Sequence, residues 1–285
     1  MFTGFNLKIN ENFFQLSNIN YEKWKKSQDE YKENVNKNLE KYLLPKDIID
    51  GKNLRDEWFP EIKADIFISH SHNDKELATK LAYWLKENFG LTSFIDSYVW
   101  GYANDLLKKI DKEYCLHETK KNSFDYDKRN YSTSHVHMML STALREMINK
   151  TECIIFLNTE NSLADNMKNI IENSTFSPWI FSEIVTTQLI QKNNISNDRI
   201  REILGEENIM QFSKQINEMA QLQIKYKLEL NHLIDLIEDD LKHWKRLNLS
   251  SDTKYPLNDL YRTKLLDIEK KSNILEIAEL LRKAT

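Results

Sequence analysis

The stretch ADIFISHSHNDKELA, residues Ala64–Ala78, decides which fold the sequence predicts. Its apolar run Ile66–Ile68 is typical of a central parallel strand that is buried on both faces. A Ser-His-Ser-His string follows immediately, and Asn73 with Glu76 three residues later predicts the start of a helix. Ligands of open α/β sheets bind outside the carboxyl ends of the strands, so this polar string indicates a candidate site.

The alternation of strands and helices continues along the chain. Apolar runs, or strict alternation of apolar and polar residues, predict further strands at residues 91–95, 153–157 and 222–230. Apolar side chains at helical spacing predict helices around residues 77–85, 106–110, 136–148, 233–244 and 274–281. The sequence therefore predicts an α/β fold with a sheet that is mostly parallel.

The expected α/β domain spans residues 61–247, with segments of different character beside it and within it. Residues 1–60 carry aromatic side chains near helical spacing among many charges, which predicts a helical N-terminal extension. Residues 111–134 form a polar segment that is longer than an ordinary connection in an α/β fold, which predicts an insertion. Residues 248–285 are expected to form a C-terminal helical segment.

Composition and glycine spacing exclude several classes of protein. The formal net charge is −4, with 40 Lys and Arg residues against 44 Asp and Glu residues, which indicates neither nucleic acid nor an anionic membrane as a partner. The five glycines lie at least 11 residues apart, so neither a GxGxxG nor a GxxxxGKS/T nucleotide-binding motif is present. Two cysteines, no signal-peptide pattern and no apolar run of membrane-spanning length lead us to expect a cytoplasmic protein.

A second informative stretch is SPWIFSEIVTTQLI, residues Ser177–Ile190. Ser177 is a favourable N-cap and Pro178 is favourable at the first helical position, so a helix is predicted to begin here. Trp179 and Glu183 are four residues apart, which places an indole and a carboxylate side by side on the helix. A carboxylate beside an aromatic wall is suited to a ribosyl transition state with oxocarbenium character. A nicotinamide leaving group departs neutral from a positive ring, so one carboxylate suffices without a general acid.

In their order along the chain, the motifs ADIFISHSHND, SFIDSYVWG, CIIFLN and SPWIFSEI resemble Toll/interleukin-1 receptor (TIR) domains of the bacterial type, over roughly residues 64–190. The resemblance implies a flavodoxin-like sheet, a catalytic Glu183 and a BB loop at Asp96–Gly101. Ile180 stands where many relatives have a cysteine. The substrate-binding residues that the resemblance implies are Ser69, His70, Asp96, Ser97, Trp100 and Trp179.

The resemblance also implies an activity. Active relatives cleave NAD+ at the nicotinamide bond and give ADP-ribose or a cyclic ADP-ribose, with NAD+ as substrate and no cofactor. It further implies self-association through TIR–TIR contacts and a role in anti-phage defence of the Thoeris type, where the product activates a separate effector. The alternative is a TIR scaffold without enzymatic activity, which signals through the Asp96–Gly101 surface.

Other reactive side chains carry weaker hypotheses. Adjacent strand residues point to opposite faces, so Ser69 and His70 are expected to support a pocket rather than to form a nucleophile–base pair. A phosphoacceptor receiver domain needs an acidic pair at this position, and the sequence therefore disfavours it. We expect no metal site, because one residue separates the members of each pair of possible zinc ligands, which are Cys115 with His117 and His135 with His137.

Overall fold

The computed structural model describes residues 3–14, 18–41, 50–117, 123–163, 174–175, 177–190, 199, 226–251, 253–265 and 267–268. It divides into two compact units, which we describe separately. The first unit comprises Met1–Gln15, Ala64–Phe94 and Ile148–Thr285, and the second comprises Leu16–Lys63 and Ile95–Met147. These units do not coincide with the three segments that the sequence predicts.

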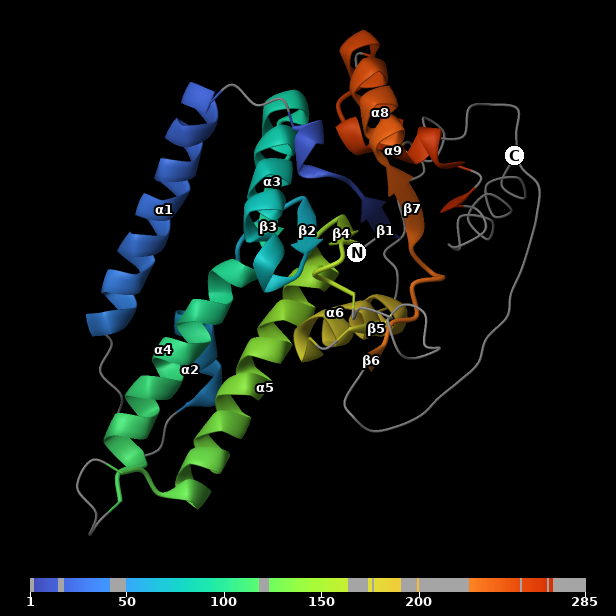
Figure 1. Ribbon diagram of the computed structural model, residues 1–285. Coiled ribbons are helices and arrows are strands. Elements are labelled where there is room, and N and C mark those ends of the chain that lie inside the picture. Colours follow the sequence, from blue (N-terminus) through green and yellow to red (C-terminus); the bar gives the residue numbers. More distant parts are fainter. Residues whose placement is uncertain are drawn as a thin grey trace. The chain divides into compact units, whose positions relative to one another are not determined.

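A five-stranded parallel sheet, in the order β3-β2-β4-β1-β7, forms the centre of the fold (Figure 1). Its strands are β1 (Thr3–Lys8), β2 (Ile66–Ser69), β3 (Ser93–Ile95), β4 (Cys153–Leu157) and β7 (Ile234–Ile237). The predicted strands at residues 66–68, 91–95 and 153–157 are confirmed, with β3 shorter than expected. The α/β class with a flavodoxin-like parallel sheet is confirmed as well.

The N-terminal strand β1 lies inside the sheet, between β4 and β7. Thr3 pairs with Cys153 and Leu7 with Leu157, while Phe5 pairs with Ile234 on the other side. The expectation of a helical extension over residues 1–60 is therefore wrong for its first residues. In a flavodoxin-like order of 2-1-3-4-5, the strand in the fourth place follows the third along the chain. Here the first strand of the chain takes that place.

A glycine permits β1 to pack in this position. A Cβ atom on Gly4 would lie 2.5 Å from Cδ2 of Leu233 and 3.0 Å from Cγ2 of Ile154. Leu233 is fully buried above this point of the sheet. Any larger residue at position 4 would therefore force a core side chain to move.

Helices cover both faces of the sheet. On one face lie α3 (Lys75–Phe89), α8 (Glu238–Ser250) and α9 (Pro256–Thr263). Their aromatic side chains form the contact, since Phe89 stacks on Trp244 at 3.9 Å between ring centroids and Tyr261 of α9 stacks on Phe5 of β1 at 6.3 Å. The C-terminal segment expected from residue 248 thus begins inside α8, and its helix α9 packs on the sheet.

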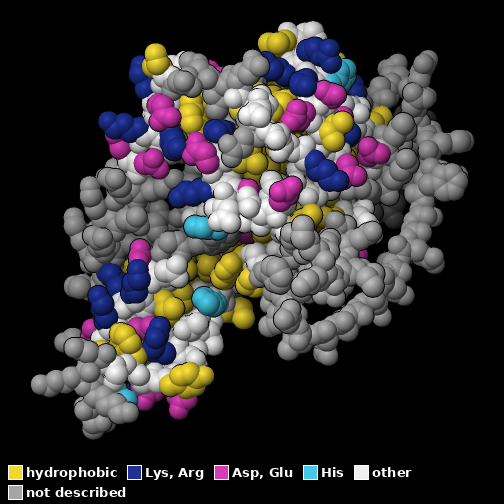
Figure 2. Space-filling view, in the orientation of Figure 1, with side chains coloured by type: hydrophobic (Ala, Val, Ile, Leu, Met, Phe, Trp, Pro, Cys, Tyr) yellow, Lys and Arg dark blue, Asp and Glu magenta, His cyan; other side chains and the backbone are white. Residues whose placement is uncertain are grey.

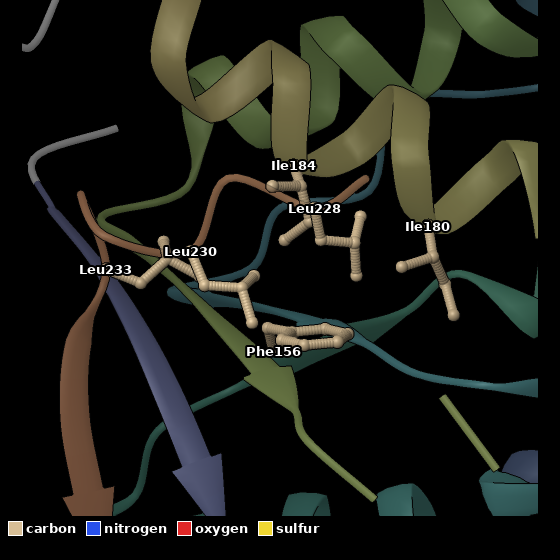
Figure 3. Close-up of a cluster of buried hydrophobic side chains, with 6 residues drawn as sticks. All are labelled: Phe156, Ile180, Ile184, Leu228, Leu230 and Leu233. Atoms are coloured by element: carbon tan, nitrogen blue, oxygen red, sulfur yellow. The ribbon is translucent and has the colours of Figure 1, made fainter. Parts of the chain in front are cut away.

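The opposite face is covered by α6 (Pro178–Leu189) and the segment that precedes β7. Figure 3 shows that α6 lies above Phe156 of β4, with Ile180 and Ile184 directed toward that ring. Leu228, Leu230 and Leu233 complete this buried cluster.

The region before β7 differs from its prediction. In the described part of the expected strand, residues 226–230, β6 (Tyr226–Lys227) is a strand that pairs antiparallel with β5 (Ser174–Thr175), and residues 228–230 are not. The fifth strand is instead Ile234–Ile237, which the sequence placed in a helix over residues 233–244. Its apolar residues fit a helix face as well as a strand, and pairing with β1 decides the outcome. Residues 222–225 and 274–281 lie outside the described residues.

The second unit contains helices α1 (Asn18–Lys41), α2 (Gly51–Trp58), α4 (Ser97–Tyr114) and α5 (Tyr126–Lys150), the last of which extends beyond it. Within the insertion predicted over residues 111–134, the described residues include the end of α4 and the start of α5, and the assignment as an insertion stays a prediction. Polar residues there link α4 to α5, since the Asp111 carboxylate accepts hydrogen bonds from Arg129 at 2.9 Å and Ser132 at 2.8 Å.

The surface of the described residues carries charges of both signs. On the face drawn in Figure 2, Lys and Arg side chains are interspersed with Asp and Glu side chains. None of the helices in the described part of the chain combines the length and the apolarity that crossing a membrane requires.

Substitution of Gly4 tests the position of β1. We expect Gly4→Ala to lower the free energy of unfolding by about 1–3 kcal/mol, because the added methyl group displaces Leu233 from a closely packed core. The matched control is Gly51→Ala, whose Cβ meets nothing within 4 Å, and it should change stability by less than about 1 kcal/mol. Urea unfolding of both variants measures the difference, and equal effects would contradict the placement of β1.

Candidate functional site

The candidate site lies at the carboxyl ends of β2 and β4, which are neighbours in the sheet. From β2 the chain continues to β3 at one edge, and from β4 it continues toward β7 at the other edge. The connections that leave these two strands therefore diverge, which makes this the topological switch point of the sheet. Ligands of open α/β sheets bind at such points.

The central contact of the site joins Ser69, the last residue of β2, to Glu183 of α6. The Ser69 hydroxyl donates a hydrogen bond of 2.6 Å to Oε2 of Glu183. Ser69 is fully buried and Glu183 is 2% exposed. A hydrogen bond of this length to a carboxylate is of the strong, charge-assisted kind. The structure therefore brings two of the predicted site residues together across 114 positions of sequence.

Helix α6 positions Glu183 through its first turn and its apolar face. The Ser177 side chain accepts a hydrogen bond from the backbone N–H of Ile180 at 3.3 Å, and Pro178 occupies the first turn. The predicted helix start is confirmed. Ile180 and Ile184 are buried against β4, which fixes the rotation of the helix and directs the neighbouring Glu183 to the end of β2. Trp179 is half-buried in the same helix, one turn before Glu183.

His70 is fully buried immediately after Ser69. Its Nδ1 lies 3.4 Å from the carbonyl oxygen of Ile68. Burial lowers the pKa of His70, and the nearby negative charge of Glu183 opposes this effect only in part. The imidazole of His70 is therefore neutral. The hydrogen bond to the Glu183 carboxylate comes from the Ser69 hydroxyl.

A polar network that the sequence did not predict joins the two segments that leave β2 and β4. Asp74, which is 6% exposed, follows β2 at the end of a 3₁₀ turn. Its carboxylate accepts hydrogen bonds from Thr159 at 2.5 Å, Asn161 at 2.7 Å and Ser162 at 3.3 Å. The network fixes the segment after β4 at the switch point. The local sequence around Asp74 does not indicate this network, because each partner lies at least 85 positions from Asp74 along the chain.

The helix start predicted at Asn73 is wrong. Asn73 lies within the 3₁₀ turn His72–Asp74, and α3 begins at Lys75. Asp74 is the N-cap residue of α3 but makes no capping bond with its side chain. Its carboxylate is engaged by the network described above, so a long-range interaction replaces the local cap.

The remaining predicted site residues belong to the second unit. Asp96 is buried, and its Oδ1 accepts a 2.6 Å hydrogen bond from the backbone N–H of Ser97. The expectation of a loop at Asp96–Gly101 is wrong, because α4 already begins at Ser97. Trp100 lies in this first part of α4, and its side chain is outside the described residues. A contribution of these three residues to substrate binding stays a prediction.

The described residues contain no group of three or more His, Cys, Asp and Glu side chains arranged to hold a metal ion. Cys115 is buried and its thiol donates a hydrogen bond of 3.6 Å to Ser132. Burial raises the pKa of the Cys115 thiol, which keeps it protonated. His135 stacks on Tyr131 with 4.4 Å between ring centroids. These side chains therefore have structural contacts within the helical unit.

Comparisons with protein-family models, with curated proteins and with solved structures find no match to this chain. A function must therefore be argued from the residues and their geometry.

The burial of His70 predicts how stability depends on pH. Because the folded state resists protonation of His70, the unfolded chain binds more protons once the pH falls below about 6.5, and stability then decreases. His70→Gln should remove this part of the pH dependence, whereas His72→Gln, an exposed histidine of the same turn, should retain it. Urea unfolding at about pH 7.5 and pH 5.5 measures the loss. Equal losses in both variants would contradict a neutral, buried His70.

Proposed function

We propose that this protein is a TIR-like enzyme that cleaves the N-glycosidic bond between nicotinamide and ribose in NAD+. The single observation that supports this most is the Glu183 carboxylate, buried at the topological switch point and held by Ser69. The ordered motifs that resemble TIR domains select NAD+ among possible substrates. The alternative of a TIR scaffold without activity makes no use of a buried, oriented carboxylate.

The proposed reaction needs one stabilised cation. The bond between C1′ of the ribose and the pyridine nitrogen breaks, and its electron pair neutralises the positive ring, so nicotinamide leaves without a proton donor. Positive charge then develops on the ribosyl carbon, where Glu183 stabilises it. A water molecule attacks C1′ and releases a proton, which gives ADP-ribose; attack by another atom of the same molecule gives a cyclic product.

The surroundings of Glu183 suit this role. A carboxylate in a buried position interacts more strongly with a developing cation than one in bulk water. Ser69 restrains one carboxylate oxygen, so less reorganisation is needed when charge develops. His70 is neutral and adds no positive charge beside the ribose.

The proposal extends to assembly and signalling. This chain resembles TIR enzymes, which act as assemblies. We therefore propose that it associates with further copies of itself when active. The ADP-ribose product, linear or cyclic, would then act as a signal for a separate effector in anti-phage defence. Activity assays therefore need a range of protein concentrations.

Nicotinamide release from NAD+ by the purified full chain tests the proposal. We expect Glu183→Gln to lower kcat by about 10²–10³-fold, because the amide stabilises a cation poorly while still accepting the hydrogen bond of Ser69. The control is Glu160→Gln, an exposed carboxylate in the segment after β4, which should keep full activity. Full turnover by Glu183→Gln, or no turnover by the wild type at any concentration, would contradict the proposal. No turnover together with concentration-dependent self-association would favour the scaffold.

A further inference from the structure

Three polar side chains form a continuous row across three strands of the sheet. Asp235 of β7 and Asn6 of β1 are paired residues, and Nδ2 of Asn6 donates a hydrogen bond of 2.8 Å to Oδ1 of Asp235. Nδ2 of Asn158, the residue after β4, donates a hydrogen bond of 2.9 Å to Oδ1 of Asn6. Asn6, the central residue of the row, is 6% exposed, whereas Asn158 is half-buried and Asp235 is exposed.

The carboxylate at one end of the row fixes the orientation of both amides. An ionised carboxylate accepts hydrogen bonds and cannot donate them, so the Asn6 amide must turn its N–H groups toward Asp235. The Asn6 oxygen then faces Asn158, which must turn its own N–H groups toward Asn6. The side-chain oxygen of Asn158, Oδ1, is thereby directed away from the row. In the described part of the chain, no donor forms a hydrogen bond with this oxygen.

The oriented oxygen lies near the Ser69–Glu183 contact. Phe156 is the register partner of Ser69 and of Asn6, and Asn158 is two residues further along. Ser69, Asn6 and Asn158 are therefore on the same face of the sheet, which is the face that α6 covers. Strand spacing places the backbone of Asn158 about 8 Å from that of Ser69. Asn158 is half-buried, so its amide is within reach of a ligand at the switch point.

We propose that Asn158 is a substrate-binding residue whose Oδ1 accepts a hydrogen bond from the N–H₂ group of the nicotinamide carboxamide, in the orientation that Asn6 and Asp235 impose. The inference rests on the proposed NAD+ cleavage and adds a determinant of specificity. If Glu183 holds the ribose, the pyridine ring and its carboxamide extend from it over a distance comparable to the Ser69–Asn158 separation. Asn6 and Asp235 are positioning residues, since they act through Asn158.

The first arm of the test compares NAD+ with 3-acetylpyridine adenine dinucleotide, in which a methyl group replaces the N–H₂ of the carboxamide. We expect Asn158→Ala to lower kcat/KM for NAD+ about tenfold and to leave kcat/KM for the analogue within about threefold of wild type. Comparing variants on each substrate removes the difference in intrinsic reactivity between the two leaving groups. Release of the pyridine base from each dinucleotide is the measurement.

The second arm tests the orientation through Asp235→Asn. The new amide can donate to Asn6 as well as accept from it, so the row can reverse and Asn158 can then present an N–H. We expect the variant to lose preference for NAD+ over the acetylpyridine analogue, and to gain activity on nicotinic acid adenine dinucleotide, whose carboxylate accepts such a hydrogen bond. Asp235 is exposed, so folding should tolerate the change. The control Asp239→Asn, on the exposed surface of α8, should keep the wild-type selectivity.

The outcomes separate this inference from the proposed function. If the wild type releases nicotinamide but Asn158→Ala lowers both activities equally, the assignment of Asn158 is overturned and NAD+ cleavage stands. If Asp235→Asn keeps the wild-type selectivity, the orienting role of the row is overturned. If the wild type releases no nicotinamide, the proposed function fails, and the inference fails with it.

Discussion

The hydrogen bond between Ser69 and Glu183 is the interaction on which the candidate site depends. Removing a carboxylate from water is unfavourable unless hydrogen bonds compensate, and Ser69 supplies one at 2.6 Å. The contact exists only because α6 packs Ile180 and Ile184 onto Phe156 of β4, the strand next to β2. Core packing thus sets where the charged group lies. A shift of α6 by one residue would rotate Glu183 away from the sheet.

The N-terminal strand connects the sheet to the candidate site. β1 supplies the hydrogen-bonding partner of both β4 and β7, so without it the sheet would be interrupted. The same strand carries Asn6, which lies between the polar residues of those two neighbours. Gly4 lies two residues before Asn6, on the same face of β1, and its lack of a side chain allows Leu233 to pack there. One short segment therefore supports both the core and the polar row.

The sequence predicted the parts of the fold that local pattern determines. The apolar runs of β2 and β4 and the Ser177–Pro178 helix start have local signals, and the four-residue spacing places Glu183 on the same helix as Trp179. Other features depend on partners distant in sequence. β1 contains Gly4 and Asn6, which weaken a strand pattern, and only pairing with its neighbours makes it a strand. Asp74 resembles an ordinary cap, and its engagement by three residues after β4 follows from the fold alone.

The polar residues on the α6 face of the sheet are concentrated toward its carboxyl ends. Ser69 ends β2, Asn158 follows β4, and Asn6 lies two residues before the end of β1. Further back on the same face, Phe67 and Ile154 are apolar and buried. A buried amide such as Asn6 gains little stability over an apolar residue of similar size, even when its hydrogen bonds are satisfied. Stability alone therefore does not account for a polar row at this end of the sheet. The ligand recognition that we propose at the switch point would account for both the position and the orientation of the row.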